Sequence, residues 1–156
     1  MNKRLKIYLA RPISGCTYQE VSEYYEDLAM VLEDYGYEVY HPMTAKGILR
    51  NDIEDREFPT TGFDHPAATN NAIFQRDRWM VHQSDVCYVN LIGAEAPSQG
   101  CISEIAIAYE NNKHIVLAME PDNVHRHAFI LCMASIIFPT HEDAERYLRQ
   151  LITGDM

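Results

Sequence analysis

The chain has 156 residues, enough for one domain with one hydrophobic core and too few for two. Hydrophobic residues make up 47% and charged residues 23%, a balance typical of globular rather than disordered proteins. With 23 acidic residues against 13 Lys and Arg, the formal net charge is −10, which repels phosphate backbones and makes nucleic acid an unsuitable partner.

Strand and helix patterns alternate along the chain. Short apolar runs typical of buried strands occupy residues 6–10, 38–41, 86–92, 114–119 and 135–138. Helical spacing predicts helices over residues 17–35, 71–84, 101–111, 126–134 and 140–152. This alternation indicates a parallel sheet covered on both faces. We therefore predict one α/β domain over residues 1–156, a three-layer sandwich around a five-stranded, mainly parallel sheet of flavodoxin-like or Rossmann-like order.

Residues 43–70 form the least regular stretch of the chain, with two glycines, two prolines and many charges. A loop of this length in a compact domain is usually functional or mobile. We interpret it as a loop insertion within the domain, and we expect Asn70 or Asn71 to cap the helix that follows.

The loops at residues 10–15 and 93–100 both follow predicted strands. In open parallel sheets, ligands bind beyond the carboxyl ends of the strands, where the winding reverses. These two loops are therefore the expected walls of a ligand pocket.

Glu104 is the only charged residue in the segment 101–109, where apolar residues lie on nearly every side of the predicted helix. A helix that is apolar all round is buried, and a buried carboxylate is unfavourable unless it is paired or functional. A structural acid that accepts hydrogen bonds is one interpretation. Because Glu104 follows a glycine-containing loop at the predicted cleft, we favour a reactive carboxylate.

Asp77 breaks its local pattern in the same way. The apolar stripe on its predicted helix consists of Ile73, Met80 and Val81. Asp77 either pairs with Arg76, Arg78 or a strand end, or faces the same cleft as Glu104. Two inward carboxylates with separated pKa values suit acid-assisted displacement at a sugar carbon.

The segment Arg11–Gly15 offers a cation, the Ser14 hydroxyl and a turn glycine, but it is neither a dinucleotide-binding nor a triphosphate-binding motif. An ordinary turn and a ligand contact both fit it. His125 and His127 have no third metal ligand at a suitable spacing, and the four cysteines form no CxxC pair. We expect no metal and no cofactor. Because no segment resembles a signal peptide or a membrane span, we expect a cytoplasmic protein.

Three motifs in order resemble those of the nucleoside 2-deoxyribosyltransferase superfamily, which includes transferases and nucleoside 5′-monophosphate N-glycosidases. They are Lys6-Ile7-Tyr8-Leu9-Ala10, then Arg76-Asp77 ahead of Ser84-Asp85-Val86, then Ser98-x-Gly100-x-x-x-Glu104. The resemblance runs from about residue 5 to 118 and is looser to the end. It implies cleavage of an N-glycosidic bond, followed by hydrolysis or by transfer to another base.

The resemblance also implies roles for particular residues. Glu104 would be the nucleophile that forms a glycosyl-enzyme intermediate. Asp77 would be the acid near the base, and Tyr8 would orient Glu104. A homodimer or higher homo-oligomer is implied too, because residues 125–133 resemble the segment that reaches a neighbour's active site. His125, His127 or Phe129 would then supply that contact.

Ser98 stands six residues before Glu104, where the transferases usually carry an acid. A carboxylate would repel a phosphate, whereas a hydroxyl beside backbone N–H groups would donate to it. We therefore favour a nucleoside 5′-monophosphate over a free nucleoside as the small-molecule substrate, with Gly100, Arg11 and Ser14 as further contacts.

Two alternatives remain open at the level of sequence. One is a phosphoribohydrolase related to lysine-decarboxylase-like proteins, although that type has a fuller glycine pair than Gln99-Gly100. The other is a non-catalytic nucleotide-sensing domain that keeps the pocket for binding only. The base, and ribose against 2′-deoxyribose, stay open as well.

Overall fold

Five parallel strands form one sheet in the order β2-β1-β3-β4-β5 in the computed structural model, which describes residues 3–53 and 56–155. The strands are β1 (Lys6–Ala10), β2 (Glu38–Tyr40), β3 (Val86–Asn90), β4 (His114–Ala118) and β5 (Ile136–Phe138). The order reverses between β1 and β3. The predicted α/β class is confirmed, and the sheet is flavodoxin-like and parallel throughout.

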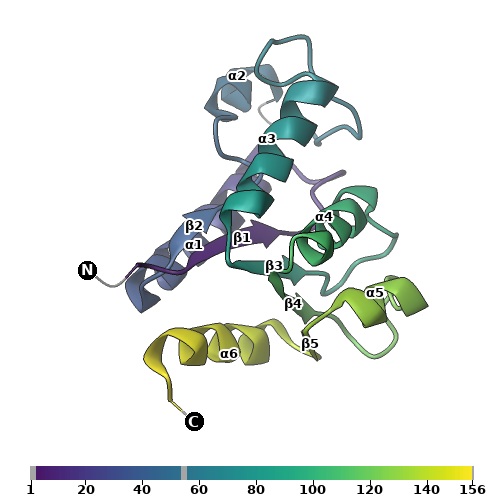
Figure 1. The fold of residues 1–156 in the computed structure, drawn as a ribbon. Helices are drawn as coiled ribbons and strands as arrows, with labels where there is room; N and C mark the ends of the chain where they lie inside the picture. Colours follow the sequence, from purple (N-terminus) through teal and green to yellow (C-terminus); the bar gives the residue numbers. More distant parts are fainter. Residues whose placement is uncertain (1–2, 54–55, 156) are drawn as a thin grey trace.

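Helices cover both faces of the sheet (Figure 1). The helices are α1 (Tyr18–Tyr35), α2 (Arg50–Ile53), α3 (Asn70–Gln83), α4 (Gln99–Glu110), α5 (Ala128–Met133) and α6 (His141–Thr153). α1 and α6 pack on one face, whereas α3, α4 and α5 pack on the other. In the part of the chain that the structure describes, no helix is long and apolar enough to cross a membrane.

The helix starts follow from side-chain capping. Thr17 caps α1 in a capping box with Glu20, which agrees with the predicted start of this helix at residue 17. The prediction for α3 was wrong, because Thr69 is the cap and accepts a hydrogen bond from Ala72 N–H at 3.1 Å. α4 starts at Gln99, two residues earlier than predicted, because the Ser98 hydroxyl caps it.

Residues 43–70 are more ordered than a loop. A 3₁₀ turn (Gly47–Leu49) leads into α2, and apolar side chains of this segment join the core beneath α1. The segment continues beside the loop after β1, where Gly15 N–H donates to Phe58 O at 3.1 Å and Phe58 N–H donates to Cys16 O at 2.7 Å. In Figure 1 this connection lies at the top, next to the N-terminal end of α3.

Gly62 fixes the last part of this segment against α3. Its N–H donates to Asn70 Oδ1 at 2.6 Å, and Phe63 N–H donates to Ala68 O at 2.8 Å. A Cβ at Gly62 would lie 2.5 Å from Asn70 N and 2.7 Å from Ala68 O, both backbone atoms. Only glycine permits this approach of two chain segments.

We predict that Gly62→Ala lowers the free energy of unfolding by about 1–3 kcal/mol, because backbone atoms must move apart to admit the methyl group. Urea denaturation measures the change. Gly47→Ala is the matched control, since a Cβ there meets nothing within 4 Å. Equal stability of the two variants would contradict the proposed close contact.

Candidate active site

A pocket of about 780 Å³ opens at the carboxyl ends of β1 and β3, where the strand order reverses. The two loops predicted as its walls both line it, and the segment between β2 and α3 supplies a third wall. Of the residues predicted for the site, those in the lining are Arg11, Ser14, Asp77, Ser98, Gly100 and Glu104.

Glu104 projects from α4 into this pocket, with Tyr8 behind it. Tyr8 lies on β1, is 0% exposed, and donates a hydrogen bond from its hydroxyl to Glu104 Oε1 at 2.6 Å. Burial raises the pKa of Glu104 to about 8, and the neighbouring charge of Asp77 adds to the rise. The hydrogen bond from Tyr8 acts in the opposite direction, because it favours the ionised carboxylate.

Asp77 reaches the same pocket from α3. Burial raises its pKa to about 6, against the opposing charges of Lys46 and Arg76. Its Oδ1 atom is buried without a hydrogen-bond partner, and within residues 3–53 and 56–155 no ion pair joins it to Arg76 or Arg78. Of the two interpretations, the one in which Asp77 faces the cleft therefore agrees with the geometry.

Lys46 is a pocket residue that sequence reasoning missed. It is only 3% exposed, lines the pocket, and its charge interacts with those of Asp77 and Glu104. Burial lowers its pKa. The one signal in the sequence is its spacing, since Lys46 stands three residues from each of the buried apolar residues Met43 and Leu49.

The N-terminus of α4 forms a further part of the pocket lining. Ser98 Oγ accepts a hydrogen bond from Cys101 N–H at 3.3 Å, which leaves the hydroxyl proton free to donate. Within the described part of the chain, the N–H groups of Gln99 and Gly100 have no acceptor, as is usual for a first helical turn. Such a turn is suited to bind an anion.

Arg11 and Ser14 lie on the wall formed by the loop after β1. The Arg11 guanidinium stacks over the Tyr24 ring, 4.6 Å from its centroid, and its Nε donates to Pro12 O at 3.3 Å. These contacts hold the cation at the pocket edge. Ser14 is exposed, so its hydroxyl is open to a ligand.

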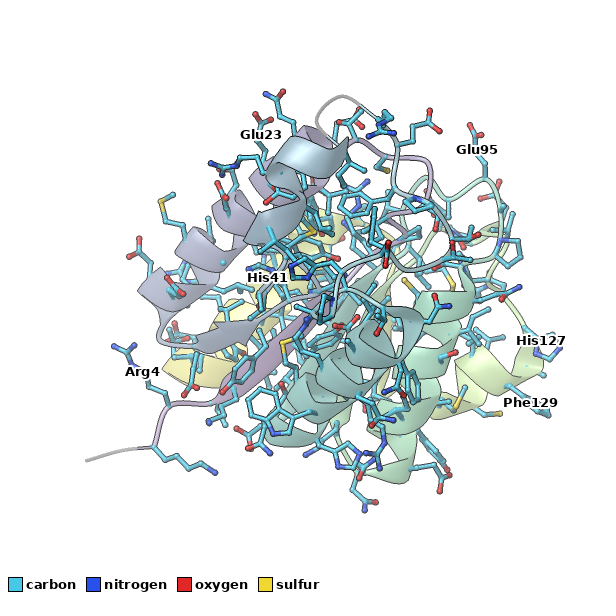
Figure 2. The ribbon with its side chains drawn as sticks, turned by 90° about the horizontal axis from the view of Figure 1, so that it is seen from above. Arg4, Glu23, His41, Glu95, His127 and Phe129 are labelled. Atoms are coloured by element: carbon cyan, nitrogen blue, oxygen red, sulfur yellow. The ribbon has the colours of Figure 1, made fainter. Side chains whose placement is uncertain are left out.

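His127 is the one predicted site residue that the structure does not bring to the pocket of its own chain. It is exposed, and its Nδ1 accepts from Phe129 N–H at 3.3 Å at the start of α5. In Figure 2 His127 and Phe129 project outward, whereas His41 lies among the central side chains. Contact with a neighbour's site stays a prediction.

His125 has a structural connection to the site instead. It is buried, and its Nδ1 lies 2.9 Å from Asn123 Oδ1, which can only accept. Its Nε2 therefore accepts from Ser98 N–H at 2.8 Å and holds the start of α4. Across residues 3–53 and 56–155, no cluster of three or more His, Cys, Asp or Glu side chains could hold a metal ion.

Comparison with known proteins assigns the chain to a family. The family model described as nucleoside 2-deoxyribosyltransferase matches residues 7–144. No curated protein matches the chain. A solved 2-deoxyribosyltransferase from Bacillus psychrosaccharolyticus is similar at 19% identity and a TM-score of 0.62, over 91% of each chain.

Two further solved structures share the fold. A CMP N-glycosidase from Clostridium botulinum has 19% identity and a TM-score of 0.54, over 94% of this chain and 97% of that chain. A 2-desoxiribosyltransferase from Leishmania mexicana has 15% identity and a TM-score of 0.59, over 94% of this chain and 97% of that chain. With the family model covering most of its length, the chain belongs to the nucleoside 2-deoxyribosyltransferase family.

Proposed function

We propose that the protein cleaves the N-glycosidic bond of a nucleoside or, preferentially, a nucleoside 5′-monophosphate, through a glycosyl-enzyme intermediate on Glu104. The observation that supports this most directly is the pair of carboxyl groups, Glu104 on α4 and Asp77 on α3, in one pocket. Their pKa values are raised to about 8 and about 6. Carboxyl pairs with separated pKa values divide the roles of nucleophile and acid.

In the first step, a Glu104 oxygen attacks the anomeric carbon C1′ while the bond from C1′ to the base nitrogen breaks. The bonding electrons pass to the base, and Asp77 gives its proton to the base. The product is an ester between Glu104 and the sugar. In the second step, water or the N–H form of a second base attacks C1′ and gives its proton to the ionised Asp77, while the bond from C1′ to Glu104 breaks and releases the carboxylate.

The proton must change places when the substrate binds. In the empty pocket the higher pKa belongs to Glu104, so the shared proton resides there at neutral pH. The nucleophile must be ionised and the acid protonated. The Tyr8 hydrogen bond stabilises the ionised Glu104, and a base nitrogen beside Asp77 gives the proton an acceptor there.

A 5′-phosphate is favoured by the donor groups at the α4 N-terminus and on the loop after β1. Free N–H groups at Gln99 and Gly100, the Ser98 hydroxyl and the Arg11 guanidinium all line this part of the pocket. Together they offer uncharged and charged donors suited to phosphate oxygens. The similar structures carry names of both reaction types, 2-deoxyribosyltransferase and CMP N-glycosidase.

Self-association is part of the proposal. Several apolar side chains are exposed around α5, among them Phe129 at 73% and Val124 at 45%. Exposed apolar patches are typical of protein interfaces. A neighbour packed there would place residues 125–133 at its active site.

We expect Glu104→Ala to reduce release of free base by at least about 10³-fold, because the covalent step loses its nucleophile. Free base is measured by chromatography over a panel of nucleosides and nucleotides. Glu110→Ala, an exposed acid on the same helix, is the control and keeps full activity. Base release that survives in Glu104→Ala would refute the covalent mechanism. Tight nucleotide binding without any turnover by the wild type would indicate the non-catalytic alternative.

The rate of base release should follow a bell-shaped pH profile with limbs near pH 6 and pH 8, set by the carboxyl pair. Below the lower pKa both groups are protonated and no nucleophile remains. Above the higher pKa both are ionised and no acid remains. Asp77→Asn should remove the bell shape, since it leaves one titrating carboxyl, and a profile unchanged by this substitution would contradict the pairing.

Ser98→Asp should lower kcat/KM for a nucleoside 5′-monophosphate by about tenfold or more, while the free nucleoside changes by about threefold or less. Asp caps a helix as well as Ser does, so the variant should keep the N-terminus of α4 in place. The substitution then only adds a negative charge next to the proposed phosphate position. Ser98→Thr is the matched control, with a cap and no charge. Equal losses for both substrates would show that no phosphate binds at this wall.

A further inference from the structure

Lys46 is an almost fully buried lysine for which the described side chains offer no acceptor. It is 3% exposed and lines the pocket. Among the side chains that the structure describes, which exclude those of 51–52 and 54–55, its ammonium has no hydrogen-bond or ion-pair partner. An ammonium carries three donors, and burying it unpaired is unfavourable. A ligand that supplies an acceptor would compensate for this burial.

The group facing Lys46 is also unsatisfied. Asp77 Oδ1 is buried without a hydrogen-bond partner, and the charges of Lys46 and Asp77 interact without a direct ion pair. A structural salt bridge would have satisfied both groups at once. Nε and Nη2 of Arg76 are also buried without a partner, but Arg76 does not line the pocket, whereas Lys46 and Asp77 both do and can both contact one ligand.

The surroundings of these two groups fit a flat ring. Apolar side chains of the segment after β2 and of α3 also line the pocket, namely Pro42, Phe63, Ile73 and Phe74. The phosphate-binding donors lie on the other walls, at Arg11 and the α4 N-terminus. The base of a bound nucleotide therefore belongs between Lys46 and Asp77.

We propose that Lys46 binds a carbonyl oxygen of the nucleobase and selects oxo bases, such as hypoxanthine, over adenine. A lysine ammonium donates hydrogen bonds and accepts none, so a carbonyl oxygen is its partner and an exocyclic amino group is not. Asp77 donates its proton to N7, the acceptor nitrogen on the same edge of the purine, since N1 of an oxo purine carries a hydrogen and cannot accept. A site with two donors rejects the analogue that presents another donor.

Lys46 also acts on the reaction itself, a role that rests on the proposed function. When the bond from C1′ to the base nitrogen breaks, the bonding electrons spread over the ring and onto the carbonyl oxygen. A positive charge already in place beside that oxygen stabilises the departing base more than the bound substrate. Loss of Lys46 therefore lowers kcat as well as raising KM.

The test compares 2′-deoxyinosine and 2′-deoxyadenosine 5′-monophosphates, two purines that differ in having a carbonyl or an amino group at one carbon. The wild type should prefer the inosine compound. Lys46→Met should lower its kcat/KM on the order of 100-fold, and that of the adenosine compound by about threefold or less. Arg50→Met removes an exposed cation from the same segment and should change neither.

Two further measurements separate the possible failures. Lys46→Met should melt at the same temperature as the wild type or higher, because methionine replaces an unpaired buried charge. Calorimetry with the free bases hypoxanthine and adenine tests recognition without turnover. If no substrate releases base but hypoxanthine binding depends on Lys46, the proposed function fails and base selection stands. Equal losses for both bases, or a wild-type preference for adenine, would overturn the role of Lys46.

Discussion

The hydrogen bond from Tyr8 to Glu104 joins β1 to α4 at the point where the strand order reverses. It depends on a sheet covered on both faces, because a tyrosine on the interior strand β1 is then shielded from water and its hydroxyl needs a protein acceptor. The same burial raises the pKa of Glu104. The hydrogen bond thus fixes the direction of the Glu104 carboxylate, and the burial of the site gives this carboxylate a higher pKa than a surface acid has.

The N-terminus of α4 brings a second set of groups to the same place. Ser98 caps the helix with its hydroxyl, while its N–H is held by the buried His125. Because the cap is anchored from the β4–α5 connection, the first turn of α4 keeps a fixed direction relative to the sheet. Glu104 stands in the next turn of the same helix, so the N-terminal N–H groups of α4 and the carboxylate are held in a fixed relation to each other.

The sequence allowed the sheet, the main helices and the pocket position to be predicted, because their patterns are local. The failures were non-local. Asn70 was expected to cap α3, but its side chain is bound by Gly62, eight residues away, and Thr69 caps instead. Lys46 was missed because its burial depends on packing between distant segments. Glu104 was recognised because an acid in an apolar helix conflicts with its own neighbours.

The local charge of the pocket differs from that of the whole chain. The chain has a formal net charge of −10, yet the cations Arg11, Lys46 and Arg78 line a pocket whose described acids are Asp77 and Glu104. Since the carboxyl pair holds one proton between pH 6 and 8, the cations exceed the ionised acids. An acidic surface repels polyanions, while a cationic pocket still attracts a small anion. This contrast fits the nucleotide substrate proposed above better than a nucleic acid.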